Sequence, residues 1–366
     1  MSTYRFVFVM EQTLGHAAHT RNLERALAAR PDVDATLIKL ADPHDDRRSR
    51  LPVLGNWTLR ASWAARRALR RRLAAGPADA VFIHTQVSSL MSVGVMRRVP
   101  TVVSLDATPE NFDAEGAAYG HARRAEVVEQ LKQRVNRRPL MAAQAIVTWN
   151  RWARNSLVVH YGIPVTKVMV IPPGVETDLF RPAEHSSGGR VRVLFVGGDL
   201  VRKGGTDLLE AMRGIGEVAE IDLVTGSEHP ALPAGLVCRL HRGLEPQSRE
   251  LVDLYRSADV FCLPSRGDCF PQVIAEAMAC GLPVVATDVG AVAEAVLHGV
   301  NGLVVPPGSP HHLRLALEAL IRDPGLRRSM GEQSLEIARR DHDARRNGEA
   351  ILDLMVACSR AREPVA

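Results

Sequence analysis

The residues best suited to chemistry lie in one stretch, Ser265–Ala286, which reads SRGDCFPQVIAEAMACGLPVVA. Its pattern predicts a strand end, a polar loop, a helix that stops at Gly281, and a further strand. Asp268 falls just before the predicted helix start, and Glu276 lies two turns along it. Helix N-termini favour phosphate or sugar oxygens, and carboxylates accept hydrogen bonds from hydroxyls. The stretch therefore predicts a ligand with a phosphate at one end and hydroxyls at the other.

The backbone between these two acids is expected to face the same ligand, at Cys269, Phe270, Pro271 and Gln272. A simpler interpretation stays open: Asp268 is a favoured type of N-cap residue, and Glu276 can be a solvated side chain.

Lys203 is a candidate cation because this sequence rarely uses lysine. Only four of its 46 basic residues are lysines, namely Lys39, Lys132, Lys167 and Lys203. Lys203 stands beside Arg202 at a predicted junction of loop and helix, where a compact ammonium group suits an anionic ligand. The alternative is a surface lysine at a helix start.

Alternating strands and helices must position these residues. Along the 366 residues, apolar runs of strand length alternate with amphipathic helical segments, which predicts doubly wound α/β domains with parallel sheets. A Pro-, Gly- and Ser-rich stretch separates two such series. The expected parts are residues 1–175, a linker at 176–190, residues 191–345, and a helix at 346–366 that can pack on the first domain. Ligands of such sheets bind beyond the carboxyl ends of the strands, so a cleft between the domains is expected.

The predicted strands of the first series are 6–10, 35–40, 80–83, 101–105, 145–149 and 168–171. Those of the second series are 191–196, 221–224, 237–240, 260–263, 284–287 and 303–305.

Composition excludes several other classes. With 46% hydrophobic and 24% charged residues the chain is globular, and its five cysteines form no C-x-x-C pair, which favours a reduced, cytoplasmic protein. No apolar run is long enough to span a membrane. Neither Gly-x-Gly-x-x-Gly nor a P-loop lysine is present, which argues against a dehydrogenase or an NTPase. The D-x-D patterns at 32–34 and 341–343 are expected to be solvated, and no metal site is predicted.

Residues 51–100 contain many arginines and a single acid, Asp79. On a helical wheel, residues 57–73 place most arginines on one arc with Trp63, opposite an arc of Ala and Leu that only Arg72 interrupts. This arrangement predicts contact with an anionic membrane surface, so peripheral attachment to the inner membrane face is an expectation. A merely solvated basic helix stays open. Nucleic acid is not an expected partner, because only 4% of residues are aromatic.

The stretch from Ser265 to Ala286 resembles the signature of retaining glycosyltransferases of family 4. In that signature an acidic residue and seven further residues precede a Glu in the context Glu-Ala-Met-Ala-x-Gly-x-Pro-Val-Val. Other segments resemble the family in the same order, at 173–182, 195–204, 254–265, 288–294 and 299–306. The resemblance covers most of the chain, more densely in the second half. It implies a GT-B fold, that is, two Rossmann-like domains facing across a cleft.

The same resemblance implies a nucleotide diphosphate sugar bound by the second domain, a glycan or lipid-linked acceptor bound by the first, and no cofactor. Glu276 would bind the ribose hydroxyls, Asp268 and the backbone after it the transferred sugar, and Lys203, near Gly197, the diphosphate. The sequence departs from the family at Asp268, where the family has Glu. It also has Gly198 where the family has Arg, for which Arg202 can compensate.

In the first half, Gly15 resembles the second glycine of the family's loop after the first strand, and is expected near donor or acceptor. His16 and His19 are candidate acceptor-binding residues, with a role as metal ligands as the rival interpretation. Asp106 follows the predicted fourth strand where the family has its catalytic His, and His121 is a second candidate. Asp106 and His121 can equally be structural.

These observations predict a retaining, metal-independent hexosyltransferase that uses a nucleotide diphosphate sugar. Two alternatives stay open: a nucleotide-sugar-binding protein without transfer activity, and a GT-B epimerase that acts on the nucleotide sugar itself.

Overall fold

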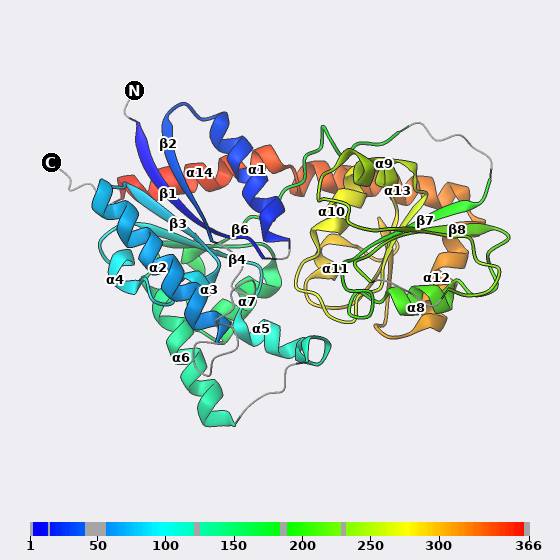
Figure 1. Cartoon of the computed structure of the whole chain (residues 1–366), viewed down its shortest axis with the longest axis horizontal. Coiled ribbons are helices and arrows are strands. Elements are labelled where there is room, and N and C mark those ends of the chain that lie inside the picture. The colour runs from blue at the N-terminus through cyan, green and yellow to red at the C-terminus, as the bar shows by residue number, and fades with distance from the viewer. Residues whose placement is uncertain are drawn as a thin grey trace. The chain divides into compact units, whose positions relative to one another are not determined.

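The computed structural model describes residues 3–13, 15–40, 56–120, 125–183, 189–227 and 232–361. The chain divides into two compact units. The first holds Met1–Asp113, Arg123–Pro173 and Ala344–Ala366, and the second holds Ala114–Ala122 and Gly174–Asp343. Each unit contains one six-stranded sheet (Figure 1). The doubly wound α/β fold predicted from the sequence is confirmed, and every predicted strand is present.

The sheet of the first unit has the strand order β2-β1-β3-β4-β5-β6, and all neighbouring strands run parallel. Strands β3, β4 and β5 are buried throughout, which explains why they are continuous apolar runs rather than alternating ones. The strands are β1 (Tyr4–Glu11), β2 (Val33–Leu40), β3 (Ala80–His84), β4 (Thr101–Leu105), β5 (Ala145–Thr148) and β6 (Val168–Val170).

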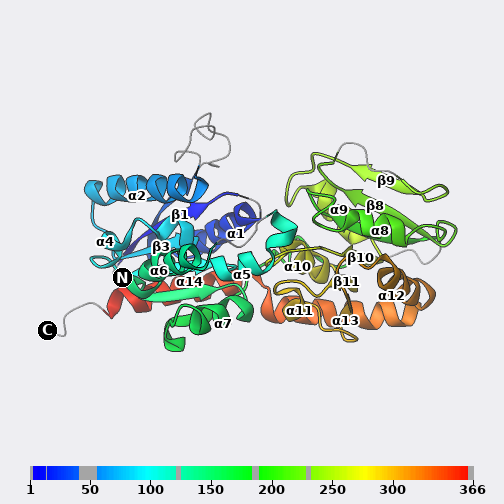
Figure 2. The same ribbon diagram turned by 90° about the horizontal axis from the view of Figure 1, so that it is seen from below.

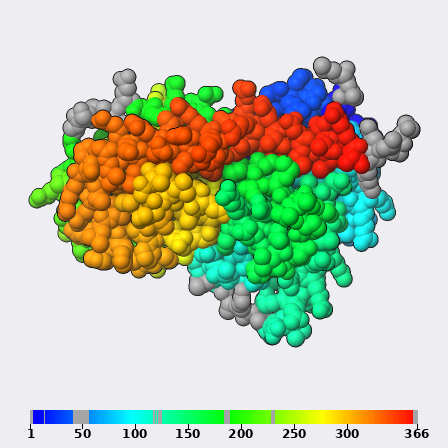
Figure 3. All heavy atoms as spheres, turned by 180° about the vertical axis from the view of Figure 1, so that it is seen from behind, coloured from blue at the N-terminus to red at the C-terminus, as the bar shows by residue number. Residues whose placement is uncertain are grey.

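One face of this sheet is covered by the first and last long helices of the chain, α1 (His16–Ala28) and α14 (Ala344–Arg360). The two helices contact each other, and a Cβ at Gly348 would lie 2.5 Å from the Cβ of Ala26, so glycine permits their close approach. Figure 3 shows this segment in red beside the blue N-terminal segment. The C-terminal helix therefore completes the first unit.

The opposite face carries α2 (Trp57–Ala75), α3 (Gln86–Ser89), α4 (Val93–Met96), α6 (Glu126–Ala142) and α7 (Arg151–Val159). Leu69 of α2 packs with Ile83, and Leu140 of α6 packs with Val103. Ile83 and Val103 are register partners, so α2 and α6 share this face. Figure 2 shows α2 on one side of the strands and α14 on the other. Two shorter elements are α5 (Pro109–Ala114) and the 3-10 turn Val165–Lys167.

The second unit repeats the plan with the parallel order β12-β11-β10-β7-β8-β9. Its strands are β7 (Val191–Val196), β8 (Ala219–Val224), β9 (Cys238–His241), β10 (Val260–Leu263), β11 (Val284–Thr287) and β12 (Gly302–Val305). Its helices are α8 (Gly205–Ala211), α9 (Arg249–Ser257), α10 (Gln272–Ala279), α11 (Val292–Ala295), α12 (Pro310–Arg322) and α13 (Pro324–Asp341). Over the residues that the structure describes, no helix is both long and apolar enough to cross a bilayer.

Candidate functional site

The candidate residues of the second half lie in two loops that follow neighbouring strands, and in helix α10 after the second loop. β7 leads through residues 197–204 into α8, and β10 leads through residues 264–271 into α10. The N–H of Arg266 donates to the carbonyl of Arg202 at 2.8 Å and ties the loops together. Because the strands are parallel, both loops leave the carboxyl edge of the sheet, where such folds bind ligands.

Lys203 and Asp268 meet between these loops. The Lys203 ammonium group contacts the Asp268 carboxylate, and the two side chains are only 15% and 10% exposed. Gly197 makes room for this lysine, because a Cβ there would lie 2.9 Å from the Cβ of Lys203. Gly204 has a φ of 73°, and a Cβ there would lie 1.8 Å from the carbonyl oxygen of Pro264. The loop after β7 thus delivers a cation against Asp268.

Asp268 is not the N-cap of α10, so that interpretation is wrong. The N-cap is Pro271, with a φ of −75° and no side-chain cap, while the Asp268 carboxylate lies 3.4 Å from Oγ of Ser265. Pro271 has no N–H, so within Cys269–Gln272 only three backbone groups can donate to a ligand. Cys269 and Phe270 are buried, which holds this backbone in place.

Glu276 is buried in the second turn of α10 at 7% exposure, so the solvated alternative is wrong. Tyr255 of α9, which is itself fully buried, donates from its hydroxyl to Oε2 of Glu276 at 2.8 Å. Burial, and then the charge of Glu276, raises the pKa of Tyr255 well above its usual value. The tyrosine therefore remains a donor that orients the carboxylate.

The two arginines of these loops have different surroundings. Nη1 of Arg202 donates to the carbonyl of Gly267 at 3.3 Å, and its Nε lies 3.7 Å from Asp199. Arg266 donates to both carboxylate oxygens of Asp207, at 2.9 and 2.6 Å. Arg202 therefore reaches the loop that carries Asp268, whereas Arg266 braces the start of α8.

Glu115, which the sequence did not indicate, reaches the same loops from the segment Ala114–Ala122. Its Oε1 accepts a hydrogen bond at 3.1 Å from the N–H of Gly290, 175 positions away in sequence. Burial, together with the charges of Asp268 and Asp288, raises the pKa of Glu115 although the Gly290 N–H opposes the shift. A third carboxyl group thus stands beside the Lys203–Asp268 pair.

In the first unit, side chains from four strand ends gather around His16, the first residue of α1. Glu11 ends β1, His84 ends β3, Asp106 follows β4, and Trp149 follows β5. Nδ1 of His16 lies 3.6 Å from Glu11, and its Nε2 lies 3.8 Å from Asp106. The topology therefore brings together His16 and Asp106, which the sequence had singled out, with Glu11, His84 and Trp149, which it had not.

The electrostatics make His16 a largely buried cation. Burial acts to lower its pKa, but the nearby carboxylates of Asp106 and Glu11 outweigh burial and raise the pKa to about 10. For Glu11, burial acts to raise the pKa, yet His16 and the hydroxyls of Thr13 and Thr85 keep it below its usual value. Thr85 donates to Glu11 at 2.7 Å. At neutral pH an imidazolium therefore lies between two carboxylates.

The other two histidines of this group are neutral. Burial, and then the charge of His16, lowers the pKa of His19 to about 3, and the same causes hold the pKa of His84 well below its usual value. The His84 ring stacks on Trp149 with centroids 5.2 Å apart. His19 is only 5% exposed, so it packs beneath the other side chains of this group and does not face solvent.

The rival metal interpretation of His16 and His19 finds no support here. A protonated His16 is a poor ligand, and no three His, Cys, Asp or Glu side chains form a metal-binding group in the described ranges. Gly15 is the N-cap of α1 with a φ of −72°, so any residue could adopt its backbone conformation. His121 lies outside the described residues.

Two Rossmann-like units with charged residues at the carboxyl edges of their sheets define the GT-B class of fold. A sucrose-phosphate synthase of Thermosynechococcus elongatus superimposes with a TM-score of 0.77 at 17% identity, covering 98% of this chain and 100% of that one. Anabaena HepE in complex with UDP-glucose superimposes with a TM-score of 0.67 at 16% identity, covering 96% and 99%. These likenesses confirm the GT-B fold.

Sequence comparison gives the family. Residues 190–323 match the family described as Glycosyl transferases group 1, and residues 14–179 match Glycosyltransferase Family 4. A D-inositol 3-phosphate glycosyltransferase of Paenarthrobacter aurescens is 30% identical over 282 residues, 70% of this chain and 67% of the relative. Another, of Kribbella flavida, is 34% identical over 210 residues, and the chain spans about half the length of this and similar relatives. The chain belongs to glycosyltransferase family 4.

Proposed function

We propose that the protein is a retaining, metal-independent enzyme that transfers a hexose from a nucleotide diphosphate sugar to a hydroxyl of a glycan or lipid-linked acceptor. The observation that carries the proposal is the largely buried Lys203–Asp268 pair beside the start of α10, with the buried Glu276 further along the same helix. Solved structures that share the fold are described in complex with UDP and with UDP-glucose, which supports a nucleotide sugar as donor.

In this proposal Lys203 stabilises the charge that develops on the departing diphosphate. An ammonium group has three N–H donors, so Lys203 can keep its contact with Asp268 and still donate to a phosphate oxygen. A fixed cation in a largely buried position stabilises that charge more than a solvated one. Arg202, on the same loop, is the second cation toward the diphosphate.

The remaining contacts with the nucleotide sugar follow from the hydrogen-bonding capacity of the side chains and backbone groups at this site. Glu276, oriented by Tyr255, accepts hydrogen bonds from the two ribose hydroxyls. Asp268 and the backbone N–H groups of Cys269, Phe270 and Gln272 bind the transferred sugar and its phosphate. Glu115 adds a carboxyl group on the sugar side, where it can distinguish hexoses by their hydroxyl positions.

On the acceptor side, the proposed catalytic group is Asp106, oriented by His16. The acceptor oxygen forms a bond to the anomeric carbon on the face from which the diphosphate departs, and the bond between that carbon and the diphosphate oxygen breaks. The hydroxyl proton passes to the departing diphosphate, so no enzyme nucleophile is needed. Asp106 is 23% exposed at its side chain and can accept the hydrogen bond of the incoming hydroxyl. His16 contacts the acceptor, His19 supports it, and His121 stays a second acceptor candidate.

The experiment that tests this proposal combines binding and turnover. A thermal-shift screen across UDP-, GDP- and ADP-sugars identifies the donor, because a bound ligand raises the melting temperature by mass action. Turnover is then measured with D-inositol 3-phosphate, the acceptor for which the relatives are named, and with glycan and lipid-linked acceptors. Donor-dependent product that requires an acceptor and retains the anomeric configuration is the expected result.

Three outcomes contradict the proposal. Donor binding without turnover favours the binding-protein alternative, and a changed sugar without acceptor favours the epimerase. Activity that is abolished by a chelator and restored by a divalent cation contradicts metal independence.

Peripheral contact with an anionic membrane surface belongs to the same proposal, because the acceptor can be lipid-linked. The basic helix α2 exposes 52% of Trp63 and 43% of Leu59, and the guanidinium of Arg67 lies 5.2 Å from the Trp63 ring centroid. Arg72, which interrupted the apolar arc in the sequence, donates instead to Thr36 of β2 and to the carbonyl of Gly76.

A further inference from the structure

Glu11 is a buried charged group of the first unit to which the proposed reaction gives no role. It ends β1, and its side chain is only 5% exposed. The hydroxyl of Thr13 donates to its Oε1, and the hydroxyl of Thr85 donates to its Oε2 at 2.7 Å. Hydrogen bonds from hydroxyls favour the charged form of a carboxyl group. The hydroxyls thus fix a buried carboxylate, and this carboxylate faces His16.

The three charged side chains of this site are arranged from the interior toward solvent. The side chain of Glu11 is 5% exposed, that of His16 12%, and that of Asp106 23%. His16 lies between the two acids, with Nδ1 at 3.6 Å from Oε1 of Glu11 and Nε2 at 3.8 Å from Oδ2 of Asp106. Asp106 is the most open to a substrate, so Glu11 can influence a substrate only through His16.

The place of His16 between two carboxylates favours one protonation state. A neutral imidazole has a single N–H, and its other ring nitrogen is an acceptor, whereas an imidazolium has two N–H donors. With Glu11 at one ring nitrogen and Asp106 at the other, only the imidazolium turns an N–H toward both acids. The neutral ring would turn a lone pair toward one of them. The geometry therefore requires a second proton on His16.

The other described neighbours of His16 are neutral rings. The His84 ring lies edge-on to it with centroids 4.6 Å apart, and the Trp149 ring lies edge-on at 5.4 Å. Burial, and then the charge of His16, lowers the pKa of His84 and of His19, so neither carries a charge near neutral pH. In the described part of the chain, the two carboxylates therefore set the charge balance at His16.

Asp106 depends on His16 for the direction of one of its oxygens. The N–H of Ala107 donates to Oδ1 of Asp106 at 2.9 Å, and Nδ2 of Asn150 donates to the Asp106 carbonyl at 2.9 Å. Oδ2 is the oxygen that faces Nε2 of His16. If His16 turns a lone pair toward Oδ2, the attraction that directs this oxygen becomes a repulsion.

We propose that Glu11 is a positioning residue for glycosyl transfer: it keeps both ring nitrogens of His16 protonated, and His16 then holds Oδ2 of Asp106 where the acceptor hydroxyl meets it. The proposal rests on the role given above to Asp106. Glu11 transfers no proton and does not touch the substrate. Loss of its charge releases Asp106 while every group that contacts the acceptor stays in the chain.

Nitrogen NMR of the full chain with isotopically labelled histidine tests the link between Glu11 and His16 without a substrate. Both ring nitrogens of His16 should carry protons at about pH 8, above the ordinary pKa of histidine. The variant His16→Gln identifies their signals by removing them. In Glu11→Gln the ring should lose its second proton about one pH unit lower or more, because one of two opposite charges is gone. A neutral His16 in the parent at that pH, or an unchanged titration in Glu11→Gln, would overturn the proposal.

The pH profile of kcat/KM tests the link between His16 and the reaction. Activity of the parent should persist toward the His16 pKa of about 10. The alkaline limb of Glu11→Gln should move down by about one pH unit or more, with a loss of about tenfold near pH 8. Glu11→Asp keeps the charge on a shorter side chain and should retain more of that limb. A merely structural role would lower activity equally at every pH, and that result would contradict the proposal.

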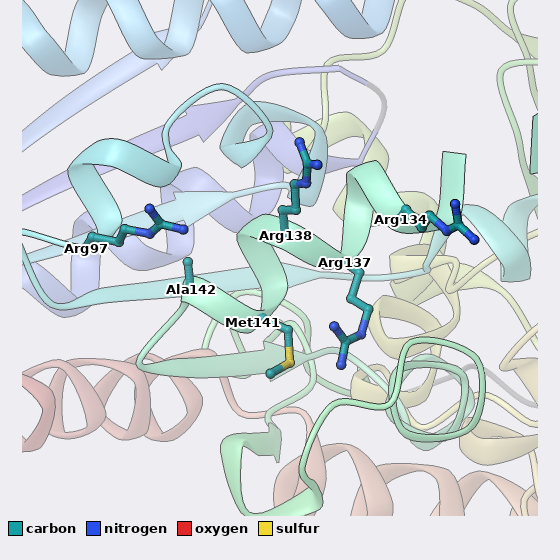
Figure 4. Close-up of a pocket in the computed structure, with 6 residues that line it drawn as sticks. All are labelled: Arg97, Arg134, Arg137, Arg138, Met141 and Ala142. Atoms are coloured by element: carbon teal, nitrogen blue, oxygen red, sulfur yellow. The ribbon is translucent and has the colours of Figure 1, made fainter. Parts of the chain in front are cut away.

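Two control variants separate this effect from a general change in charge. Glu24→Gln makes the same substitution elsewhere on α1, where Glu24 forms a partly exposed pair with Lys39. Arg138→Gln removes a charge near the amino edge of the same sheet, since α6 leads into β5. Figure 4 shows that edge, where a pocket of about 500 Å³ is lined by Arg97, Arg134, Arg137 and Arg138. Both controls should keep the titration and the pH profile of the parent, and an equal shift in either would overturn the proposal.

The two measurements distinguish this proposal from the proposed function. A parent without transfer activity whose His16 titration depends on Glu11 contradicts the proposed function and leaves the link between Glu11 and His16 standing. A parent that transfers, with an unchanged alkaline limb in Glu11→Gln, contradicts this proposal alone. Melting temperatures report whether Glu11→Gln folds; if it does not, the ring nitrogens of the parent and the profile of Glu11→Asp decide.

Discussion

The two units use the carboxyl edges of similar sheets in different ways. In the second unit, a glycine-rich loop brings Lys203 and Arg202 against the short polar loop that carries Gly267 and Asp268. In the first unit the cation is His16, which is enclosed by Glu11 and Asp106 and by neutral rings. A diphosphate requires fixed positive charge, whereas a neutral hydroxyl requires a hydrogen-bond acceptor. The difference suits a charged donor in one unit and a neutral nucleophile in the other.

We expect the largest effect when the ammonium group of Lys203 in the second unit is removed. Lys203→Met should lower kcat/KM about 100-fold or more, because charge on the departing group loses its fixed partner. The control is Lys39→Met, since Lys39 is an exposed lysine paired with Glu24. Steady-state kinetics with the identified donor measure both. Equal activity of the two variants would contradict the role given to Lys203.

A smaller effect concerns the loop that carries Gly290. Gly290 has a φ of 53°, and a Cβ there would lie 1.9 Å from the carbonyl oxygen of Asp268. Gly299 has a φ of 78° with nothing within 4 Å of its Cβ position. Gly299→Ala should therefore cost about 1 kcal/mol of backbone strain, and Gly290→Ala about 2–3 kcal/mol together with weaker donor binding. Chemical denaturation and donor titration measure the pair; equal costs would mean that the contact with Asp268 is relaxed easily.

The smallest effect, taken per pH unit, is a pH dependence of the free energy of unfolding that comes from His16 in the first unit. The folded pKa of His16, about 10, lies above its ordinary value of 6.5, so its stabilisation is complete below about pH 6.5 and is lost as pH rises toward 10. The free energy of unfolding should fall by at most about 1.4 kcal/mol per pH unit in that window. His16→Gln should flatten this slope, whereas His160→Gln, at an exposed position, should preserve it. Parallel slopes for His16→Gln and the parent would contradict a buried imidazolium.

The sequence predicts the site of the second unit better than that of the first, because the residues of the second site lie closer together in the sequence. Asp268 and Glu276 lie within one loop and helix, so their spacing alone brings them to one ligand. Their exact surroundings depended on Pro271, which caps α10, and on Tyr255, which buries Glu276. Neither surrounding can be read from the spacing of the two acids, so the sequence alone could not decide between ligand-binding acids and an N-cap Asp268 with a solvated Glu276.

The residues that sequence analysis missed are joined by topology. Glu11 and His84 end separate strands and Trp149 follows a third, and only the strand order β1-β3-β4-β5 makes them neighbours. Glu115 meets Gly290 across 175 positions. The fold, by contrast, follows from local patterns: buried parallel strands are mostly apolar, and most of them are followed by a helix.

The last helix of the chain has a consequence for how the protein is made. Because α14 packs with Phe8, Phe82 and Val102 of the first sheet, this face has only α1 as cover until the ribosome has completed the whole second unit. The first unit is the earliest to be synthesised and the last to be closed. Its sheet keeps part of one apolar face exposed while nearly half of the chain is still being translated.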